Sequence, residues 1–364
     1  MQVEMNATND SATNITGKLH TECAIESASN TTKTLVIMGF ALVLFSSLFG
    51  NSLLIRVVYG DKESRRKFPF NFLIINMAIA DIMNASSASL VFMSFLTVGR
   101  LWISGIVGQL TCKITYFAVG FSVAASILTV VVMGLDRFMA AHATIRPLSK
   151  KGIKYAMALI WVLAGLFCIP YLYIFRIEQG TDGKCHCIRK WSKNPQKHLM
   201  ILGIEEMAKF VVFYLLPLVL MVFCYTIITY RIYRRSELPV GKNTRSKIVQ
   251  QNQRVVRMII AIVAIFAICW LPVHVNHLLR SFDPDSYCRL PAFLPLSFFW
   301  LAHVNCAINP WVWFMYSRHF RELLRKATIQ CVANFWNDKS EQIPLTKRTT
   351  IKQLENLGDR KSVV

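Results

Sequence analysis

Seven long apolar segments are the feature that most restricts how this chain can fold. They cover about residues 34–58, 70–96, 109–135, 155–175, 206–230, 258–280 and 291–316. Each holds roughly the 20 mostly apolar residues that a helix needs to cross a bilayer. Backbone groups in lipid must pair internally, so only helices or closed barrels can span it, and these segments are too long for barrel strands. The sequence therefore predicts an all-α membrane protein, a bundle of seven transmembrane helices.

The positions of the basic residues predict the orientation, because Lys and Arg are retained on the cytoplasmic side during insertion. Of the 41 basic residues, 27 lie in the first, third and fifth loops and the C-terminal tail, and 11 lie in the N-terminal segment and the other loops. We therefore expect a plasma-membrane protein with an extracellular tail over 1–33, a seven-span domain over 34–317, and a short amphipathic cytoplasmic helix and tail over 318–364. The formal charge of +21 then indicates attraction to anionic inner-leaflet lipid rather than to nucleic acid.

Modification motifs and cysteines agree with this orientation. Four Asn-X-Ser/Thr triplets on the N-terminal side are candidate glycosylation sites: Asn6, Asn9, Asn14 and Asn30. Five cysteines fall in or beside segments assigned to the outside, where oxidation is permitted: Cys23, Cys112, Cys185, Cys187 and Cys288. Cys331 lies in the cytoplasmic tail, where palmitoylation and an unmodified thiol are both compatible with its position.

A series of short motifs follows the spans in order. In the first four spans they are Gly50-Asn51, Asn76, Asp81, Cys112, Asp136-Arg137-Phe138, Trp161 and Pro170. In the last three they are Pro217, Tyr225, Phe266, Cys269-Trp270-Leu271-Pro272, Asn305 and Asn309-Pro310. Together these motifs resemble the rhodopsin-like class of G-protein-coupled receptors over residues 34–331. The resemblance implies that the chain binds an extracellular ligand and activates a heterotrimeric G protein.

Asp81 is the only acidic residue in the middle of a predicted span, and a carboxylate there is costly without polar partners. The resemblance implies that Asp81, with Ser126, Asn305 and Asn309, holds an allosteric sodium ion that favours the inactive state, with Ser122 nearby. The alternative is that Asp81 is a hydrogen-bonded or protonated packing residue without an ion. No other cofactor is expected.

The resemblance also assigns an activation switch. Its residues are Ile127, Pro217, Tyr225, Phe266, Trp270, Asn309, Pro310 and Trp313. Within this set, Ile127, Pro217 and Phe266 match the connector between the ligand pocket and the cytoplasmic opening, and an ordinary aromatic core is the alternative. Trp313 replaces a tyrosine whose hydroxyl normally reaches Tyr225 through water. Trp313 therefore either leaves that bridge incomplete or serves as a packing residue.

Coupling to the G protein is assigned by resemblance to the cytoplasmic end of the third span. Asp136, Arg137 and Phe138 form the motif whose arginine meets the C-terminal helix of the G protein, and Ile145 resembles the loop residue that enters a G-protein pocket. A simple exposed ion pair between Asp136 and Arg137 is the alternative. Asn252 stands where some relatives carry an acid that holds this arginine, so no such ionic lock is expected here.

The second outer loop is basic and contains Cys185-His186-Cys187. Alternating residues around the two cysteines suit a β-hairpin lid of the kind found in peptide receptors. The resemblance implies a disulfide from Cys112 to Cys187 or Cys185, of which we favour Cys187, and a possible second bridge between Cys23 and Cys288.

The ligand class follows from the residues at two positions. Val119 replaces the aspartate of amine receptors, and His303 replaces the Schiff-base lysine of opsins, so neither an amine nor retinal is expected. The pattern is most similar to the neuropeptide branch, which includes tachykinin, neuropeptide Y, galanin and RFamide receptors. The expected pocket is lined by Val119, Val123, Trp270, His274, His277, Phe299 and His303. The basic lid favours an acidic peptide, with a solvated loop face as the alternative.

Other functions are less compatible with the sequence. An orphan or lipid receptor of the same fold is the main rival, whereas a transporter or channel would need broken helices, repeats or several intramembrane charges. No catalytic constellation is present, so an enzyme is not expected. The tail offers kinase sites for arrestin recruitment at Thr346, Thr349, Thr350 and Ser362, and Ser362-Val363-Val364 resembles a PDZ ligand.

Overall fold

The computed structural model describes residues 28–60, 69–141, 146–180, 182–236, 244–317, 320–326 and 328–329. The elements are α3 (Asn30–Gly60), α5 (Asn71–Val98), α6 (Gly105–Ala141), α7 (Lys150–Ile174), β1 (Phe175–Gln179), β2 (Cys185–Arg189), α8 (Pro195–Phe210), η1 (Val211–Leu215), α9 (Leu216–Ser236), α10 (Thr244–Phe282), α11 (Pro284–Cys288) and α12 (Phe293–Tyr316). Several predicted sites lie outside the described residues: Asn6, Asn9, Asn14, Cys23, Ile145, Cys331, the side chain of Asn252, and the kinase and PDZ positions of the tail.

Internal contacts divide the chain into two units, Met1–Ser317 and Arg318–Val364. All elements from α3 to α12 belong to the first unit. In the second unit residues 320–326 are helical, and Thr328 Oγ1 donates to the Leu324 carbonyl at 2.9 Å. A short helix therefore follows the last span.

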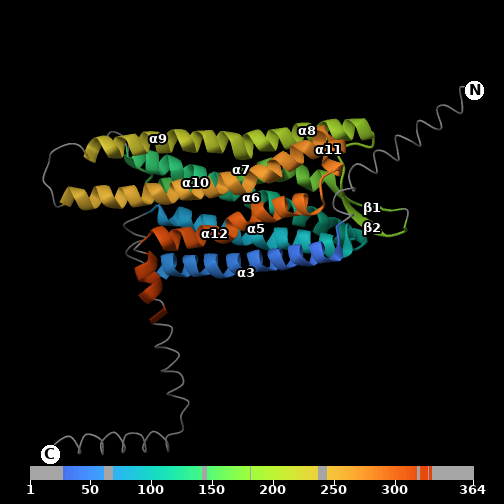
Figure 1. Cartoon of the computed structure of the whole chain (residues 1–364), viewed down its shortest axis with the longest axis horizontal. Helices are drawn as coiled ribbons and strands as arrows, with labels where there is room; N and C mark the ends of the chain where they lie inside the picture. Colours follow the sequence, from blue (N-terminus) through green and yellow to red (C-terminus); the bar gives the residue numbers. More distant parts are fainter. Residues whose placement is uncertain are drawn as a thin grey trace, which may run out of the picture. The chain divides into compact units, whose positions relative to one another are not determined.

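The helices of the first unit run alongside one another as a bundle (Figure 1). Helix α3 packs against α5 and α12, α5 packs against α6, α6 packs against α7 and α9, and α10 packs against α9 and α12. Within the described residues, six helical stretches are long and apolar enough to cross a membrane, with α8, η1 and α9 forming one of them. Helix α12 carries no acidic or basic residue and supplies the seventh predicted span. The seven-helix bundle expected from hydropathy is therefore present.

The fifth span begins earlier than its apolar segment indicated, at Pro195 rather than near residue 206. The Asn194 side chain accepts a hydrogen bond from the Lys197 amide at 3.1 Å and so caps the helix, and Pro195 fits the first turn, where no amide donor is required. Because the helix begins at Pro195, Glu205 and Glu206 lie inside it and not at its boundary with the loop. Hydropathy alone misplaced this boundary because the first turns of α8 are polar.

A π-helical turn, η1, interrupts the same span immediately before Pro217. Proline has no amide donor and its ring clashes with the carbonyl four residues earlier, so a wider turn relieves both problems. The turn directs Tyr214 inward, where its hydroxyl donates to the Ala267 carbonyl of α10 at 3.1 Å. Sequence reading predicted the proline but not the wide turn.

Buried polar side chains tie the helices together. Asn51 of α3 donates to the Cys306 carbonyl of α12 at 3.1 Å. Asn76 of α5 donates to Thr129 Oγ1 of α6 at 2.8 Å and accepts from Trp161 Nε1 of α7 at 2.9 Å. Such pairs are favoured in a membrane bundle because lipid offers no alternative partners.

The second outer loop forms an antiparallel hairpin of β1 and β2 in which Ile177 faces Cys187. A disulfide joins Cys187 to Cys112 near the outer start of α6, which confirms the favoured pairing, and Cys185 is a free cysteine. Cys288 is also disulfide-bonded, and its partner, for which Cys23 was predicted, lies outside the described residues. The hairpin is thus attached covalently at one end of the bundle (Figure 1).

Cys185 and Cys187 provide a matched pair for testing this attachment. Replacing Cys187 with serine should sharply reduce folded receptor at the cell surface, because it opens the loop between α6 and the lid. Replacing Cys185 with serine should leave surface levels near those of the unmodified chain. Surface immunolabelling measures both variants. Equal loss in the two, or a free Cys112 thiol in peptide mapping of unreduced protein, would contradict the pairing.

Candidate functional site

The lid is held by backbone bonds as well as by the disulfide. The Trp102 amide donates to the Cys185 carbonyl at 2.8 Å, and the Cys187 amide donates to the Arg100 carbonyl at 3.0 Å, so the first outer loop extends the hairpin. On the other strand, the Ile177 amide donates to Gln109 Oε1 of α6 at 3.0 Å. The outer face of the bundle is therefore covered by a fixed β structure.

A compact charge cluster links the lid to α8. Arg189 of β2 contacts both Glu205 and Glu206, with Arg189 Nη1 2.8 Å from Glu206 Oε1. Lys209 Nζ lies 2.6 Å from Glu205 Oε1, and Trp191 Nε1 donates to Glu205 Oε2 at 2.6 Å. Burial alone would lower the pKa of Arg189, because it disfavours the charged form. The carboxylates of Glu206 and Glu205 have the larger effect together and raise this pKa above its ordinary value. Glu206 is only 5% exposed, so these charges depend on one another.

The cluster corrects the interpretation of the lid as a free basic surface. Arg189 is paired with two acids, and Lys190 Nζ lies 2.7 Å from Glu178 Oε2 within the hairpin. The exposed cations that remain in this loop are Lys184, Lys193 and Lys197. The expectation of an acidic peptide therefore rests on fewer charges than the sequence indicated.

Most of the predicted pocket residues form one chain of ring contacts beneath the lid. Trp270 lies 6.1 Å from His274 and 6.2 Å from His303, measured between ring centroids. His277 packs edge-on against Phe299 at 5.2 Å. His303 Nδ1 donates to Asn84 Oδ1 at 3.1 Å, which fixes that histidine between α5 and α12. Val119 and Val123 are half-buried on α6, and only Val123 and Trp270 of the predicted set line the cavity described below.

Two of the three predicted connector residues, Ile127 and Phe266, lie together in one buried cluster. Ile127, Tyr214 and Phe266 form a buried apolar cluster, and Trp270 packs against it. Pro217 is also buried and follows Tyr214 by three residues in the same span. The π-helical turn before Pro217 directs the Tyr214 side chain into the cluster. The connector residue that sequence reading missed was thus set by local backbone geometry.

Asp81 is fully buried at the junction of α5, α6 and α12. Its Oδ1 accepts from Ser126 Oγ at 2.8 Å, and its Oδ2 accepts from Asn309 Nδ2 at 2.8 Å. Asn305 makes no hydrogen bond to Asp81 in the described structure, contrary to expectation. Ser122 turns its hydroxyl to the carbonyls of its own helix, so it does not reach Asp81 either.

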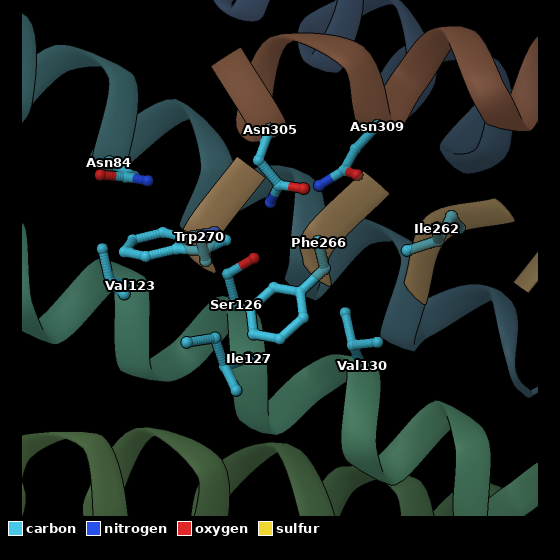
Figure 2. Close-up of a pocket in the computed structure, with 10 residues that line it drawn as sticks. All are labelled: Asn84, Val123, Ser126, Ile127, Val130, Ile262, Phe266, Trp270, Asn305 and Asn309. Carbon is cyan, nitrogen blue, oxygen red and sulfur yellow. The ribbon is translucent and has the colours of Figure 1, made fainter. Parts of the chain in front are cut away.

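A small cavity is lined by both donors to Asp81, Ser126 and Asn309, but not by Asp81 itself, and it has room for about one water molecule or ion. Its lining residues are Asn84, Val123, Ser126, Ile127, Val130, Ile262, Phe266, Trp270, Asn305 and Asn309. Figure 2 shows Asn305 and Asn309 projecting from one helix toward the space above Ser126 and Phe266. The Oδ1 atoms of Asn305 and Asn309 are buried and lack hydrogen-bond partners among the described residues. Two unpaired oxygens on residues that line this cavity suit a hard cation, which prefers oxygen ligands.

At the C-terminal end of α6, Asp136 is buried and Arg137 is partly exposed, with 1% and 27% of their side chains accessible. Arg137 Nη2 lies 2.5 Å from Asp136 Oδ2, and Asp136 Oδ1 accepts from the Leu148 amide at 2.9 Å. The pair is therefore anchored by the loop before α7 rather than freely exposed. Phe138 follows on the same helix and is half-buried.

Trp313 is 1% exposed, which places its indole inside the bundle. Its ring centroid lies 6.2 Å from that of Phe70 at the start of α5. The Tyr225 hydroxyl is buried without a hydrogen-bond partner among the described residues. Both interpretations of Trp313 are compatible with this burial and with the unpartnered Tyr225 hydroxyl.

The residues that sequence reading overlooked are Glu205, Glu206 and Lys209. Two adjacent acids followed three and four residues later by a lysine, at the start of an apolar helix, were the available signal. That spacing places the lysine beside both acids on one helix face. The partner Arg189 could not be assigned because it comes from another element.

Comparison with known proteins identifies the family of this chain. Residues 50–313 match the 7 transmembrane receptor (rhodopsin family). The chain belongs to this family. It is 26% identical to tachykinin-like peptides receptor 86C of Drosophila melanogaster, over 82% of this chain and 59% of that protein. It is 29% identical to the substance-P receptor of Cavia porcellus, over 78% and 68%, and 27% identical to galanin receptor type 1 of Rattus norvegicus, over 80% and 81%.

The chain spans less than two thirds of the length of two Drosophila relatives. The chain covers 59% of receptor 86C and 57% of tachykinin-like peptides receptor 99D from the same organism. The region that matches the family, residues 50–313, contains the helices from α5 to α11, the hairpin lid and parts of α3 and α12. The chain is therefore a multi-pass membrane protein of a receptor family.

The charge cluster should contribute strongly to stability. Replacing Arg189 with methionine leaves two buried carboxylates with one lysine, and removing one partner of a buried pair costs roughly 3 kcal/mol. The thermal unfolding midpoint of the solubilised protein should fall by several degrees. Lys190→Met is the matched control, because its pair with Glu178 is about one-third exposed and such a pair is worth under about 1 kcal/mol.

A second variant separates charge from packing in this cluster. Adding Glu206→Gln to Arg189→Met removes one of the two carboxylates that have lost their arginine partner. The thermal unfolding midpoint of this double variant should therefore be higher than that of Arg189→Met alone. Equal destabilisation by Arg189→Met and Lys190→Met, or no recovery in the double variant, would contradict the account of the cluster.

Proposed function

We propose that the chain is a plasma-membrane receptor that binds an extracellular peptide and activates a heterotrimeric G protein. The observation that carries the proposal is the disulfide-bonded hairpin lid at one end of a bundle (Figure 1) whose helices α10 and α12 meet in the ring contact of Trp270 with His303. A broad, fixed β surface suits an extended peptide, because the ligand can contact the lid and the helices together. The printed names of the relatives, receptors for tachykinin-like peptides, substance P and galanin, support this class of ligand.

The orientation of the proposed receptor places the N-terminus outside. The basic loops between α3 and α5, between α6 and α7 and between α9 and α10 then face the cytoplasm. The Asp136–Arg137 pair, where the G protein would bind, faces the same side. The proposed pocket uses Val119, Val123, Trp270, His274, His277, Phe299 and His303. Arrestin, a receptor kinase and a PDZ protein remain proposed partners of the tail, with glycans at the N-terminal asparagines and a lipid at Cys331.

A sodium ion is proposed as an allosteric ligand of the Asp81 site. Asp81, Ser126, Asn305 and Asn309 would hold it, and the unpaired oxygens of the two asparagines support the fit. The ion would supply a positive charge that stabilises the buried carboxylate. Its occupancy would therefore favour the packing of α5, α6 and α12 seen here.

The test of the proposed function is a parallel screen in transfected cells. A panel of amidated peptides that includes substance P and galanin is compared with a panel of lysophospholipids and fatty acids, reading calcium and cyclic AMP together. A saturable peptide response that is absent in untransfected cells supports the proposal. Responses to lipids alone would replace it with a lipid receptor of the same fold.

Arg137→Ala should separate binding from signalling. The residue lies at the cytoplasmic end of α6, so binding of a peptide agonist should remain measurable while nucleotide exchange on the G protein falls about tenfold or more. Radioligand binding and nucleotide exchange are compared at matched surface expression. Undiminished exchange would show that this pair is not the coupling site.

Asp81→Asn should abolish the sodium dependence of agonist affinity. Replacing potassium with sodium at constant ionic strength should lower agonist affinity about fivefold in the unmodified receptor, since coupling of two ligands through one protein is typically of this size. The variant keeps the side-chain shape and loses the charge. Equal insensitivity of both proteins to sodium would leave Asp81 as a hydrogen-bonded packing residue.

A further inference from the structure

The arginine at the cytoplasmic end of α6 has an aromatic partner besides its acidic one. The Arg137 Cζ atom lies 4.1 Å from the centroid of the Phe70 ring, over its face. A guanidinium within about 6 Å of a ring centroid is attracted by the ring quadrupole, and the attraction strengthens as water is excluded. Phe70 is only 8% exposed, so its ring offers Arg137 a largely dry surface.

Phe70 is in turn held by α12. It immediately precedes α5, and its ring centroid lies 6.2 Å from that of Trp313, with the two planes tilted by 55°. Trp313 is among the largest fully buried side chains in the described structure. The three side chains therefore connect the start of α5, the end of α6 and the end of α12 in one stack.

Helix α10 offers no carboxylate to these three side chains. No acidic residue occurs between positions 238 and 282, so α10 carries no carboxylate that could hold Arg137 from that side. Asp136 fixes one edge of the guanidinium, and its other oxygen is engaged by the Leu148 amide. The face of the guanidinium is covered by Phe70. The orientation of Arg137 is thus set by one acid and one ring.

We propose that Phe70 is a positioning residue that holds Arg137 in its resting orientation, and that Trp313 braces the Phe70 ring. The proposal rests on the proposed G-protein coupling and names how the resting state is maintained. A shift of α12 at Trp313 would withdraw the brace, weaken the contact between Phe70 and Arg137, and free the guanidinium to turn toward the G-protein side. Loss of the ring face should therefore raise signalling in the absence of any ligand.

Substitutions at Phe70 distinguish the ring from simple bulk. Phe70→Leu keeps apolar volume but removes the ring, whereas Phe70→Tyr keeps the ring. In lipid nanodiscs with purified heterotrimer and no ligand, Phe70→Leu should raise the rate of nucleotide exchange about fivefold, and Phe70→Tyr should stay near the unmodified rate. Phe72→Leu is the matched control, because Phe72 is a half-buried phenylalanine two residues further along that does not contact Arg137 in the described structure.

A second measurement does not depend on coupling. In receptor labelled with ¹⁵N-arginine, the Nε–H signal of Arg137, assigned by its loss in Arg137→Lys, should be shifted by the ring current of Phe70. The shift should persist in Phe70→Tyr and Phe72→Leu and disappear in Phe70→Leu. An Arg137 signal that is the same in Phe70→Leu and the unmodified receptor would overturn the proposal.

The two measurements also separate the possible failures. If exchange is undetectable even with a peptide agonist while the Arg137 signal responds to Phe70, the proposed coupling function fails and the positioning contact stands. If exchange rises equally in Phe70→Leu and Phe70→Tyr, the effect comes from disturbed packing and the positioning role is wrong.

Discussion

A buried carboxylate in an apolar bundle is the constraint on which the interior of this protein depends. Asp81 cannot be solvated by lipid, so α5, α6 and α12 must bring donors to it, and Ser126 and Asn309 supply them at 2.8 Å each. The same requirement explains the bonds that Asn51 and Asn76 make to neighbouring helices. These bonds fix the mutual rotation of helices that apolar packing alone would leave poorly determined. The same arrangement positions the small cavity and the ring contacts of Trp270 with His274 and His303.

The two ends of the bundle stabilise partly buried charges with different partners. At the outer end, Arg189 joins the lid to the acidic pair of α8, so a ligand that displaces the lid also disturbs the top of the fifth span. At the inner end, Arg137 is balanced between Asp136 and the face of Phe70. The cluster at the lid end pairs charges with opposite charges, whereas the one at the other end pairs a charge with both an acid and a ring.

Much of the fold followed from the sequence because hydropathy, basic-residue placement and motif order are local signals. The seven helices, the hairpin lid and the bond between Cys112 and Cys187 were predicted correctly. The contact of Tyr214 with Ile127 and Phe266 was missed, because a π-helical turn changes side-chain direction without changing hydropathy. The partners of Glu206 were missed for a different reason. Ion pairs between elements depend on tertiary contacts that one sequence does not specify.

The central claim is that ligand binding beneath the lid changes the packing at the cytoplasmic end of the bundle. The most direct test places spin labels at the exposed positions Ala140 of α6 and Arg257 of α10, in receptor reconstituted in lipid nanodiscs. Distance distributions are recorded with and without a peptide agonist from the screen. The account predicts that agonist shifts the distribution to longer distances and that sodium shifts it back. An unchanged distribution at saturating agonist, in receptor that still activates its G protein, would contradict it.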